Sequence, residues 1–259
     1  MENIKVITSK DNSLIKLVCN LQTSAKARKE NGLFVLEGKR ICDDAYSAKI
    51  KFDKLIISDT AFEKYYETVE KFSENANEIY KIPDSLFKKI SDTVNPQGII
   101  ALANIPKINN KIKQTGRFIA LENINDPSNL GAVFRTAEAL GVSGIILSND
   151  GCDPYSPKSL RASMGTLLRL PIIVTENLPE FVKASNLKSY ACVVDKNAKS
   201  ITDINFSNGC VLMIGNEANG LTEEAKKVAD YNITIRMSGL AESLNASVAA
   251  AISMWEMMK

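Results

Sequence analysis

The sequence contains no histidine among its 259 residues. This absence excludes a Ser-His-Asp triad, a histidine general base and the commonest zinc and non-haem iron sites. Any chemistry must therefore use Arg, Lys, Asp, Glu, Ser, Asn or a bound cofactor. We expect an α/β protein without a metal site.

Paired cysteines are also missing. The five cysteines are widely spaced, at Cys19, Cys42, Cys152, Cys192 and Cys210. Their odd number and the lack of a CxxC pair indicate neither a disulfide framework nor a zinc site. Cys192 and Cys210 stand in apolar runs, so both are predicted to be buried strand residues.

Long apolar runs are absent as well. No run approaches the ~20 residues that a membrane span needs. The first residues, MENIKVITSK, have no apolar segment behind their charges and do not read as a signal peptide. The apolar share of 45% and the charged share of 24% are typical of a globular protein. We expect a cytoplasmic protein with no membrane contact, folded as one large domain or two ordinary ones.

A phosphate-binding glycine motif is missing too. No GxGxxG follows any predicted strand, which argues against a nucleotide-dependent oxidoreductase. Residues 121–141, LENINDPSNLGAVFRTAEALG, nevertheless read as the end of a strand, a polar turn and a helix. The turn offers Asn125, Asp126 and Ser128 in place of glycines that would cradle a phosphate.

Positive charge is concentrated at the beginning of the chain. Residues 1–29 contain six Lys or Arg and two acids, although the net charge of the whole chain is only +2. The basic residues are Lys5, Lys10, Lys16, Lys26, Arg28 and Lys29. Such a stretch can contact nucleic acid, and it can equally be a solvated helix face.

The first part of the chain alternates between helix and strand patterns. Helices are predicted at 11–30, 39–49, 61–74 and 84–92, and strands at 33–38, 53–58, 78–83 and 98–106. These elements predict an α/β domain over residues 1–106. Residues 107–116 are polar, rich in lysine and closed by glycine, so they are predicted to be an interdomain linker.

The second part, residues 117–259, alternates strictly. Strands are predicted at 117–124, 144–150, 171–176, 189–195, 209–217 and 231–237. Helices lie between them, and a helix over 244–259 closes the chain. Near-continuous apolar strands separated by helices predict a parallel sheet that is covered on both faces.

Three strand ends carry unusual polar or small residues. In an open α/β sheet the ligand lies beyond the carboxyl ends of the strands. The stretches are the turn and helix with Asn129 and Arg135, the segment 214–224, and the segment 235–251. Each has an ordinary explanation, with Asn129 or Ser243 as a helix cap and Arg135 as a surface residue. Together the three stretches indicate a functional site at the carboxyl edge of the predicted sheet.

These stretches resemble the sequence motifs of the SpoU family of RNA 2′-O-ribose methyltransferases, within the SPOUT superfamily. The matching segments are NLGAVFRTAEALG (129–141), IGNEANGL (214–221) and SLNASVAAAI (243–252). RASMGTLLRLPI (161–172) resembles the segment that the family places between them. The segment FVLEGKRICDDA resembles the L30e-like substrate-binding domain of many members.

The resemblance implies an L30e-like α/β domain followed by a SPOUT domain with a C-terminal trefoil knot and a parallel sheet. It implies a homodimer and the cofactor S-adenosylmethionine. The implied cofactor-binding residues are Gly215, Asn216, Gly220, Ile235, Met237 and Leu244. The residues implied for catalysis are Asn129, Arg135, Glu217, Ser243 and Asn245.

Two positions depart from the family pattern. Members often have Ile-Pro-Met at the end of the last strand, where this chain has Ile235, Arg236 and Met237. The second motif commonly reads Gly-x-Glu-Gly, but Ala218 replaces its second glycine here. Both departures are expected to affect the shapes of the loops and, through them, the affinity for the cofactor.

The functional hypothesis is methylation of a ribose 2′-oxygen, with ribosomal RNA of the 23S type favoured as substrate. Transfer RNA and the reaction of an antibiotic-resistance methylase are the alternatives. Since a guanidinium stays protonated, Arg135 is interpreted as binding a phosphate and polarising the hydroxyl. A hypothesis from another class is a non-enzymatic RNA-binding protein that keeps the fold.

Overall fold

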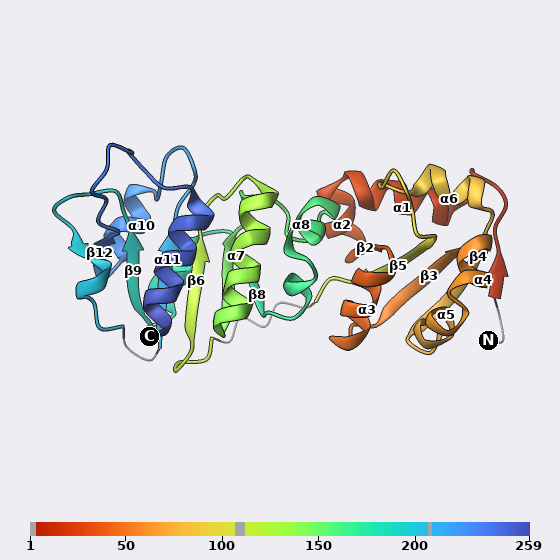
Figure 1. Ribbon diagram of the computed structural model, residues 1–259, viewed down its shortest axis with the longest axis horizontal. Helices are drawn as coiled ribbons and strands as arrows, with labels where there is room; N and C mark the ends of the chain where they lie inside the picture. The colour runs from red at the N-terminus through yellow and green to blue at the C-terminus, as the bar shows by residue number, and fades with distance from the viewer. Residues whose placement is uncertain (1–3, 107–111, 207–208) are drawn as a thin grey trace. The chain divides into compact units, whose positions relative to one another are not determined.

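A computed structural model describes residues 4–106, 112–206 and 209–259 (Figure 1). The chain divides into two compact units. Unit 1 comprises Met1–Pro106 with Tyr155–Arg161, and unit 2 comprises Lys107–Pro154 with Ala162–Lys259. Residues 107–111 of the predicted linker lie outside the described residues.

Unit 1 is built on a five-stranded sheet in the order β1-β4-β3-β5-β2. Its strands are β1 Ile4–Val6, β2 Leu33–Glu37, β3 Phe52–Ser58, β4 Ala76–Ile82 and β5 Ile99–Asn104. β5 runs antiparallel to β2 and β3, and the other neighbours are parallel. β1 was not predicted, because three residues are too few to show an alternating pattern.

Helices cover the sheet of unit 1. They are α1 Ser13–Thr23, α2 Ala25–Asn31, α3 Lys39–Ser47, α4 Asp59–Lys64, α5 Tyr66–Ser73 and α6 Asp84–Ile90. α1 and α6 pack against each other, and their apolar residues form one core with Val35, Ile56 and Ile100 of the strands. α3 and α5 also pack together. The predicted α/β organisation is confirmed.

Two predicted helices are each divided in the structure. The helix expected at 11–30 breaks at Ser24, which is extended and whose side chain accepts a hydrogen bond from the backbone N of Ala27. The helix expected at 61–74 breaks at Tyr65, whose φ of −119° and ψ of 34° are not helical. Both breaks depend on single residues inside continuous amphipathic patterns, so periodicity did not reveal them.

Arg28 is buried, which corrects its interpretation as an RNA contact. Only 4% of its surface is exposed, and its Nη1 donates to the carbonyl oxygens of Leu21 and Gln22 at the end of α1. A cation suits the C-terminus of a helix, where carbonyl groups lack partners. Arg28 therefore joins α1 to α2, whereas the other lysines predicted to contact RNA remain exposed: Lys10, Lys16, Lys26 and Lys29.

Unit 2 is built on a seven-stranded sheet in the order β10-β12-β9-β11-β6-β7-β8. Its strands are β6 Arg117–Leu121, β7 Gly144–Ser148, β8 Ile172–Thr175, β9 Lys188–Cys192, β10 Lys199–Ser200, β11 Cys210–Ile214 and β12 Tyr231–Thr234. Every neighbouring pair is parallel. The predicted parallel sheet is confirmed, with the two-residue β10 as an unpredicted edge strand.

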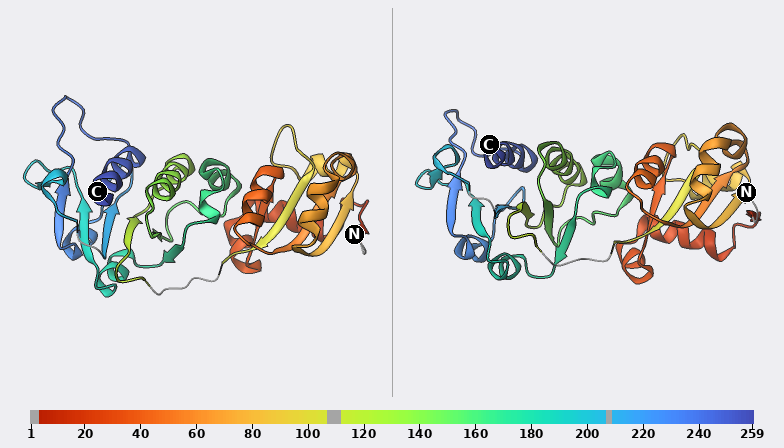
Figure 2. Two further views of the ribbon diagram at one scale, coloured as in Figure 1. Left: turned by 60° about the horizontal axis from the view of Figure 1, so that its bottom comes forward. Right: turned by 90° about the horizontal axis from the view of Figure 1, so that it is seen from below.

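Helices lie on both faces of this sheet (Figure 2). The elements of unit 2 are α7 Pro127–Leu140, α9 Leu178–Ala184, α10 Glu223–Val228, α11 Ala246–Met258 and the short 3-10 helices η1 Thr166–Leu168 and η2 Ile201–Asp203. Most of α8 Pro157–Ser163 belongs to the Tyr155–Arg161 segment of unit 1. α7 packs against α11 on one face, and α9 packs against α10 on the other. None of the described helices has the length and apolar character that a membrane crossing requires.

All six strands predicted in unit 2 end earlier than predicted, and the ends of β11 and β12 matter most for the site. β11 ends at Ile214 and β12 at Thr234, whereas the apolar patterns suggested ends at 217 and 237. The residues beyond these ends form loops at the carboxyl edge of the sheet. Cys210 is buried as predicted, but Cys192, the last residue of β9, is only half-buried.

The structure predicts that Arg28 stabilises unit 1. Arg28→Ala leaves the carbonyls of Leu21 and Gln22 without this cation, so we expect a loss of about 2 kcal/mol in the free energy of unfolding. Lys29→Ala, which removes a neighbouring exposed cation, should change it by less than about 0.5 kcal/mol. Urea unfolding measures both, and equal effects would contradict the assigned role.

Candidate active site

The three predicted strand ends meet at one edge of the unit 2 sheet. β6 leads into α7 through a turn at 122–126, β11 leads into α10 through a loop at 215–222, and β12 leads into α11 through a loop at 235–245. β6 and β11 are hydrogen-bonded neighbours up to Leu121 and Ile214. The parallel arrangement therefore brings distant segments together, as the sequence predicted.

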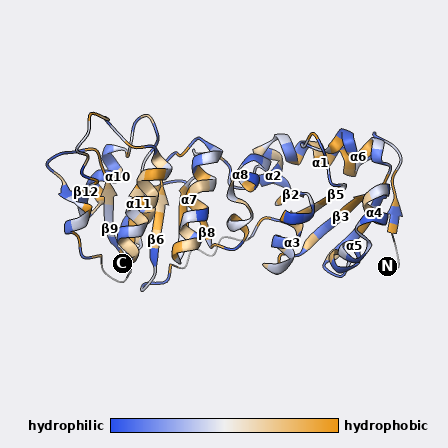
Figure 3. Cartoon of the chain, in the orientation of Figure 1, coloured by the Kyte–Doolittle hydropathy of each residue, from blue (hydrophilic) through white to orange (hydrophobic). Residues whose placement is uncertain are grey.

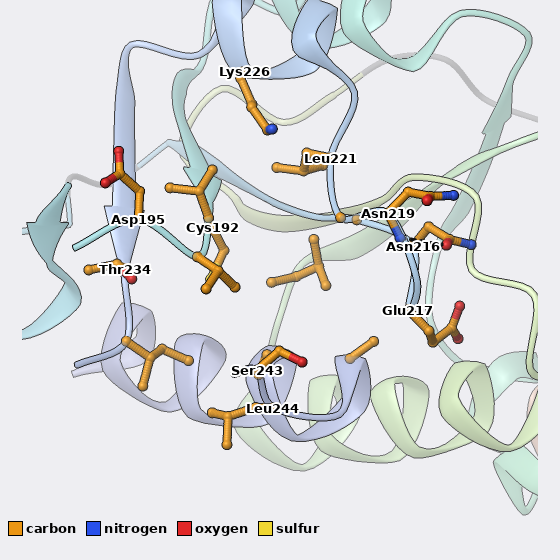
Figure 4. A pocket seen from close by; sticks show the side chains of 18 of the residues that line it. Cys192, Asp195, Asn216, Glu217, Asn219, Leu221, Lys226, Thr234, Ser243 and Leu244 are labelled. Carbon is orange, nitrogen blue, oxygen red and sulfur yellow. Dashed lines mark hydrogen bonds between the residues drawn. The ribbon is translucent and has the colours of Figure 1, made fainter. Parts of the chain in front are cut away.

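A pocket of about 780 Å³ opens at this edge (Figure 4). The loops that follow β9, β11 and β12 line it, together with residues of α10 and the start of α11. All six predicted cofactor residues are among its lining residues: Gly215, Asn216, Gly220, Ile235, Met237 and Leu244. Glu217 and Ser243, predicted for catalysis, also line it.

The loop at 215–222 is a tight turn closed by its own hydrogen bonds. The backbones of Asn216 and Gly220 exchange bonds of 3.1 and 2.9 Å. The Asn216 Oδ1 accepts from the backbone N of Ala218 at 2.8 Å, and Gly220 has a φ of +67°, which favours glycine. Ala218 is not among the non-glycine residues with positive φ, so this departure fits the turn.

Gly215 is required by the same turn. A Cβ at this position would lie 2.1 Å from the carbonyl carbon of Gly220 and from the backbone N of Leu221. Backbone atoms cannot give way as a flexible side chain can, so any larger residue here would reshape the loop. A loss of ligand binding in a Gly215 variant would therefore report loop damage as well as a blocked pocket.

The turn after β6 holds this loop at both ends. The buried Glu122 carboxylate accepts hydrogen bonds from the backbone N and the Oγ1 of Thr222, both at 2.8 Å. The Asn216 Nδ2 donates to the carbonyl oxygen of Asn123 at 2.7 Å. Thr222 in turn caps α10, since its side chain accepts from the backbone N of Ala225. The two loops are thereby fixed to each other.

Three of the predicted catalytic residues form one polar cluster. The Asn129 Nδ2 donates to Glu217 Oε1 at 2.8 Å, and the Asn245 Nδ2 donates to Asn129 Oδ1 at 3.1 Å. Asn129 is only 7% exposed, and its amide nitrogen and oxygen each bond to one of these neighbours. Neither Asn129 nor Ser243 is a helix cap: Asp126 caps α7, and Asn245 caps α11.

Arg135 and Ser243 lie outside this cluster. Arg135 is exposed on α7, six residues after the buried Asn129, which places the two side chains about 120° apart around the helix. Ser243 is an exposed residue that lines the pocket just before α11. The structure thus joins Asn129, Glu217 and Asn245, while Arg135 presents its guanidinium to the solvent.

The pocket also contains residues that the sequence did not single out. The charged ones are Asp195, Glu223, Lys226, Lys227 and Glu242. Lys226 pairs with Glu223 at 2.8 Å, and its hydrogen bond lowers the pKa of that carboxyl. Asp195 follows β9, whose carboxyl end lies at the same edge, so the rule used for the other strand ends could have found it.

The described part of the chain contains no group of three or more acidic or cysteine side chains that could hold a metal ion. The polar side chains that line the pocket are amides, carboxylates, hydroxyls, a thiol and two lysines.

Known proteins match both parts of the chain. Residues 116–255 match the SpoU rRNA Methylase family, and residues 12–101 match the MRM3-like substrate binding domain. The chain is 28% identical over 257 residues to the 23S rRNA (guanosine(2553)-2'-O)-methyltransferase RlmP of Bacillus subtilis, covering 98% of this chain and 99% of the relative. It is 29% identical over 192 residues to a 23S rRNA (uridine(2479)-2'-O)-methyltransferase of Streptomyces viridochromogenes, covering 70% and 67%.

A solved structure agrees in fold. The AdoMet-bound rRNA methyltransferase from Sinorhizobium meliloti matches with a TM-score of 0.84 and 28% identity, covering 98% of this chain and 97% of that one. The family match covers more than half of the chain and includes all the residues of the polar cluster and the pocket. The chain therefore belongs to the SpoU rRNA Methylase family.

Proposed function

We propose that this protein is an S-adenosylmethionine-dependent RNA 2′-O-ribose methyltransferase that acts on ribosomal RNA of the 23S type. The observation that carries the proposal is the position of Glu217, which lines the pocket and also accepts a hydrogen bond from Asn129. One side chain thus connects the ligand pocket to Asn129 on α7. The names of the relatives support the same reaction.

The pocket suits S-adenosylmethionine. Its volume falls within the range of small-molecule sites. Ile235, Met237 and Leu244 offer apolar surface for an adenosine, and the backbone of the 215–220 turn offers hydrogen-bonding groups. The lining acids outnumber the lining lysines, which suits a sulfonium and an ammonium group. When bound, this cofactor supplies an activated methyl group.

The polar residues would align the RNA hydroxyl. Alignment of the attacking oxygen is the main requirement of a methyl transfer. Glu217 Oε1 is held by Asn129, whereas its Oε2 has a long contact of 3.5 Å with the backbone N of Asn125. Glu217 Oε2 can therefore accept a hydrogen bond from a ribose hydroxyl. Ser243, at the pocket wall, can donate or accept another.

Arg135 would bind the RNA phosphate beside the target sugar. Its guanidinium stays protonated and presents several N–H donors, which suits a phosphate. Its exposure on α7 leaves it accessible to a large ligand. In this arrangement Asn129 acts through Glu217 and Asn245 rather than on the sugar itself, because both ends of its amide are already bonded.

We propose that the two domains have different functions. We assign residues 1–106 to RNA recognition, residues 107–116 to a linker and residues 117–259 to the reaction. The exposed Lys10, Lys16 and Lys29 support the first assignment, since cations attract RNA phosphates. A location in the cytoplasm, with the ribosomal RNA, completes this proposal.

We further propose a trefoil knot and a homodimer. The segment after β12 returns across the sheet so that α11 packs on β11, β6 and α7, which is compatible with threading. α11 consists mostly of apolar residues, and many of its residues have the hydrophobic colours in Figure 3. Val248, Ile252 and Trp255 are 45%, 39% and 59% exposed, and their spacing places them on one stripe. A second copy of the chain would cover this stripe.

The cofactor assignment predicts an effect of Leu244→Ala. Leu244 lines the pocket, so removing its side chain should weaken S-adenosylmethionine binding about fivefold through lost apolar contact. Leu240 lies in the same loop, is fully exposed and does not line the pocket, so Leu240→Ala is the matched control. Calorimetry measures both affinities. Equal affinity in all three proteins would refute this location of the site.

The reaction predicts an effect of Arg135→Ala. Losing the phosphate ligand should reduce turnover about 100-fold while the affinity for S-adenosylmethionine stays unchanged. Arg135→Lys keeps the positive charge but lacks the planar guanidinium. Its turnover should lie between those of the wild type and Arg135→Ala. Full turnover by Arg135→Ala would contradict the role of this residue.

The product tests the reaction itself. With labelled S-adenosylmethionine and ribosomal RNA lacking the modification, nucleoside mass spectrometry should find the added methyl on the ribose. A methyl on the base would refute ribose methylation. Failure of the protein to bind S-adenosylmethionine would favour an RNA-binding protein without activity.

The dimer predicts an effect of Trp255→Glu. A charge on the apolar stripe should disrupt pairing of two copies, so light scattering should give 28.4 kDa for the variant and twice that mass for the wild type. Val94→Glu alters an exposed valine of unit 1 and should leave the mass unchanged. A monomeric wild type at micromolar concentration would exclude the dimer.

A further inference from the structure

Arg236 links two loops that form different walls of the pocket. It is the second residue after β12, and its side chain crosses to the turn that follows β9. Its Nη1 donates to the carbonyl oxygen of Lys196 at 2.7 Å, and its Nη2 donates to that of Ala198 at 3.4 Å. The family resemblance leads us to expect proline at this position, where this chain has arginine.

The turn that receives Arg236 is itself ordered. The Asp195 Oδ1 accepts from the backbone N of Asn197 at 2.8 Å, and the backbone N of Ala198 donates to the carbonyl oxygen of Asp195 at 3.2 Å. After this turn the chain pairs with β12 through Lys199 and Ser200. The acceptors of Arg236 are therefore backbone groups held at fixed places beside the end of β12.

The two linked loops both contribute to the pocket. Val193, Val194 and Asp195 line it from the β9 side. Ile235 and Met237, the two neighbours of Arg236, line it from the β12 side. In Figure 4, Asp195 and Thr234 lie together on one side of the pocket, opposite Asn216 and Glu217. The hydrogen bonds of Arg236 therefore hold the loops after β9 and β12 together on this side of the pocket.

We infer that Arg236 is a positioning residue that preorganises the cofactor pocket by fastening residues 235–237 to the turn at 195–198. A proline would restrict this segment through its fixed φ. Arg236 restricts it through charge-assisted hydrogen bonds to carbonyl oxygens instead. Ordering the segment before binding lowers the entropy that the ligand must remove. This inference rests on the proposed cofactor site.

The expected consequence concerns affinity and not the chemical step. Arg236 is exposed and does not line the pocket, so its removal should act through Ile235 and Met237. We expect Arg236→Gln to raise the Kd and the KM for S-adenosylmethionine about fivefold, with kcat at saturating cofactor within about twofold of the wild type. The KM for RNA should stay unchanged.

Lys196→Ala provides the matched control. It removes one positive charge from the same turn but keeps the carbonyl oxygen that Arg236 uses. A hydrogen-bonding role predicts normal cofactor affinity for Lys196→Ala, whereas a general electrostatic role predicts the same loss as in Arg236→Gln. Arg236→Lys, whose ammonium is compact and lacks the fork, should show an intermediate Kd.

A measurement without cofactor tests the link itself. Hydrogen exchange of the full-length protein should be faster at the amides of 196–198 and 235–238 in Arg236→Gln than in the wild type, with the thermal unfolding midpoint unchanged. Faster exchange together with a weaker Kd supports the inference. Unchanged exchange, an unchanged Kd, or an equal loss in Lys196→Ala overturns it. If the wild type binds no S-adenosylmethionine, the proposed function fails, while hydrogen exchange still decides whether Arg236 orders the two loops.

Discussion

The candidate site depends on the hydrogen bonds between the turn after β6 and the loop after β11. Glu122 is buried, and both of its carboxylate oxygens are used by Thr222. A buried carboxylate without such partners would be costly, so this pairing strongly favours one arrangement of the loop. The bond from Asn216 to the carbonyl of Asn123 fixes the other end. The pocket and the polar cluster both rest on this pair of loops.

This arrangement explains how a nucleotide-binding type of sheet can function without a glycine-rich phosphate loop. The turn at 215–220 needs glycine at Gly215 for close backbone packing and at Gly220 for its positive φ. Neither glycine is needed to approach a phosphate. The resulting pocket presents backbone, apolar side chains and carboxylates, a combination that suits a cationic adenosine derivative better than a dinucleotide.

Three arginines show that burial and hydrogen-bond partners together decide the role of a positive charge. Arg28 is buried and binds carbonyl oxygens of its own domain, so it stabilises the fold. Arg236 is exposed, yet its guanidinium is engaged by backbone carbonyls of a neighbouring loop. Arg135 is exposed on a helix and is the one that we assign to RNA. Neither the sequence position of these arginines nor their shared positive charge predicts which of these roles each one has.

The sequence by itself determined the alternation of elements, the parallel sheet and the edge at which the site lies, because apolar runs and strand ends are local properties. Family motifs supplied the candidate residues. The breaks at Ser24 and Tyr65 and the true ends of β11 and β12 depended on local hydrogen bonds that periodicity does not record. Only the tertiary structure decided that Asn129 joins Glu217 and Asn245, since these residues are 88 and 116 positions away and meet through packing of α7, α11 and the β11 loop.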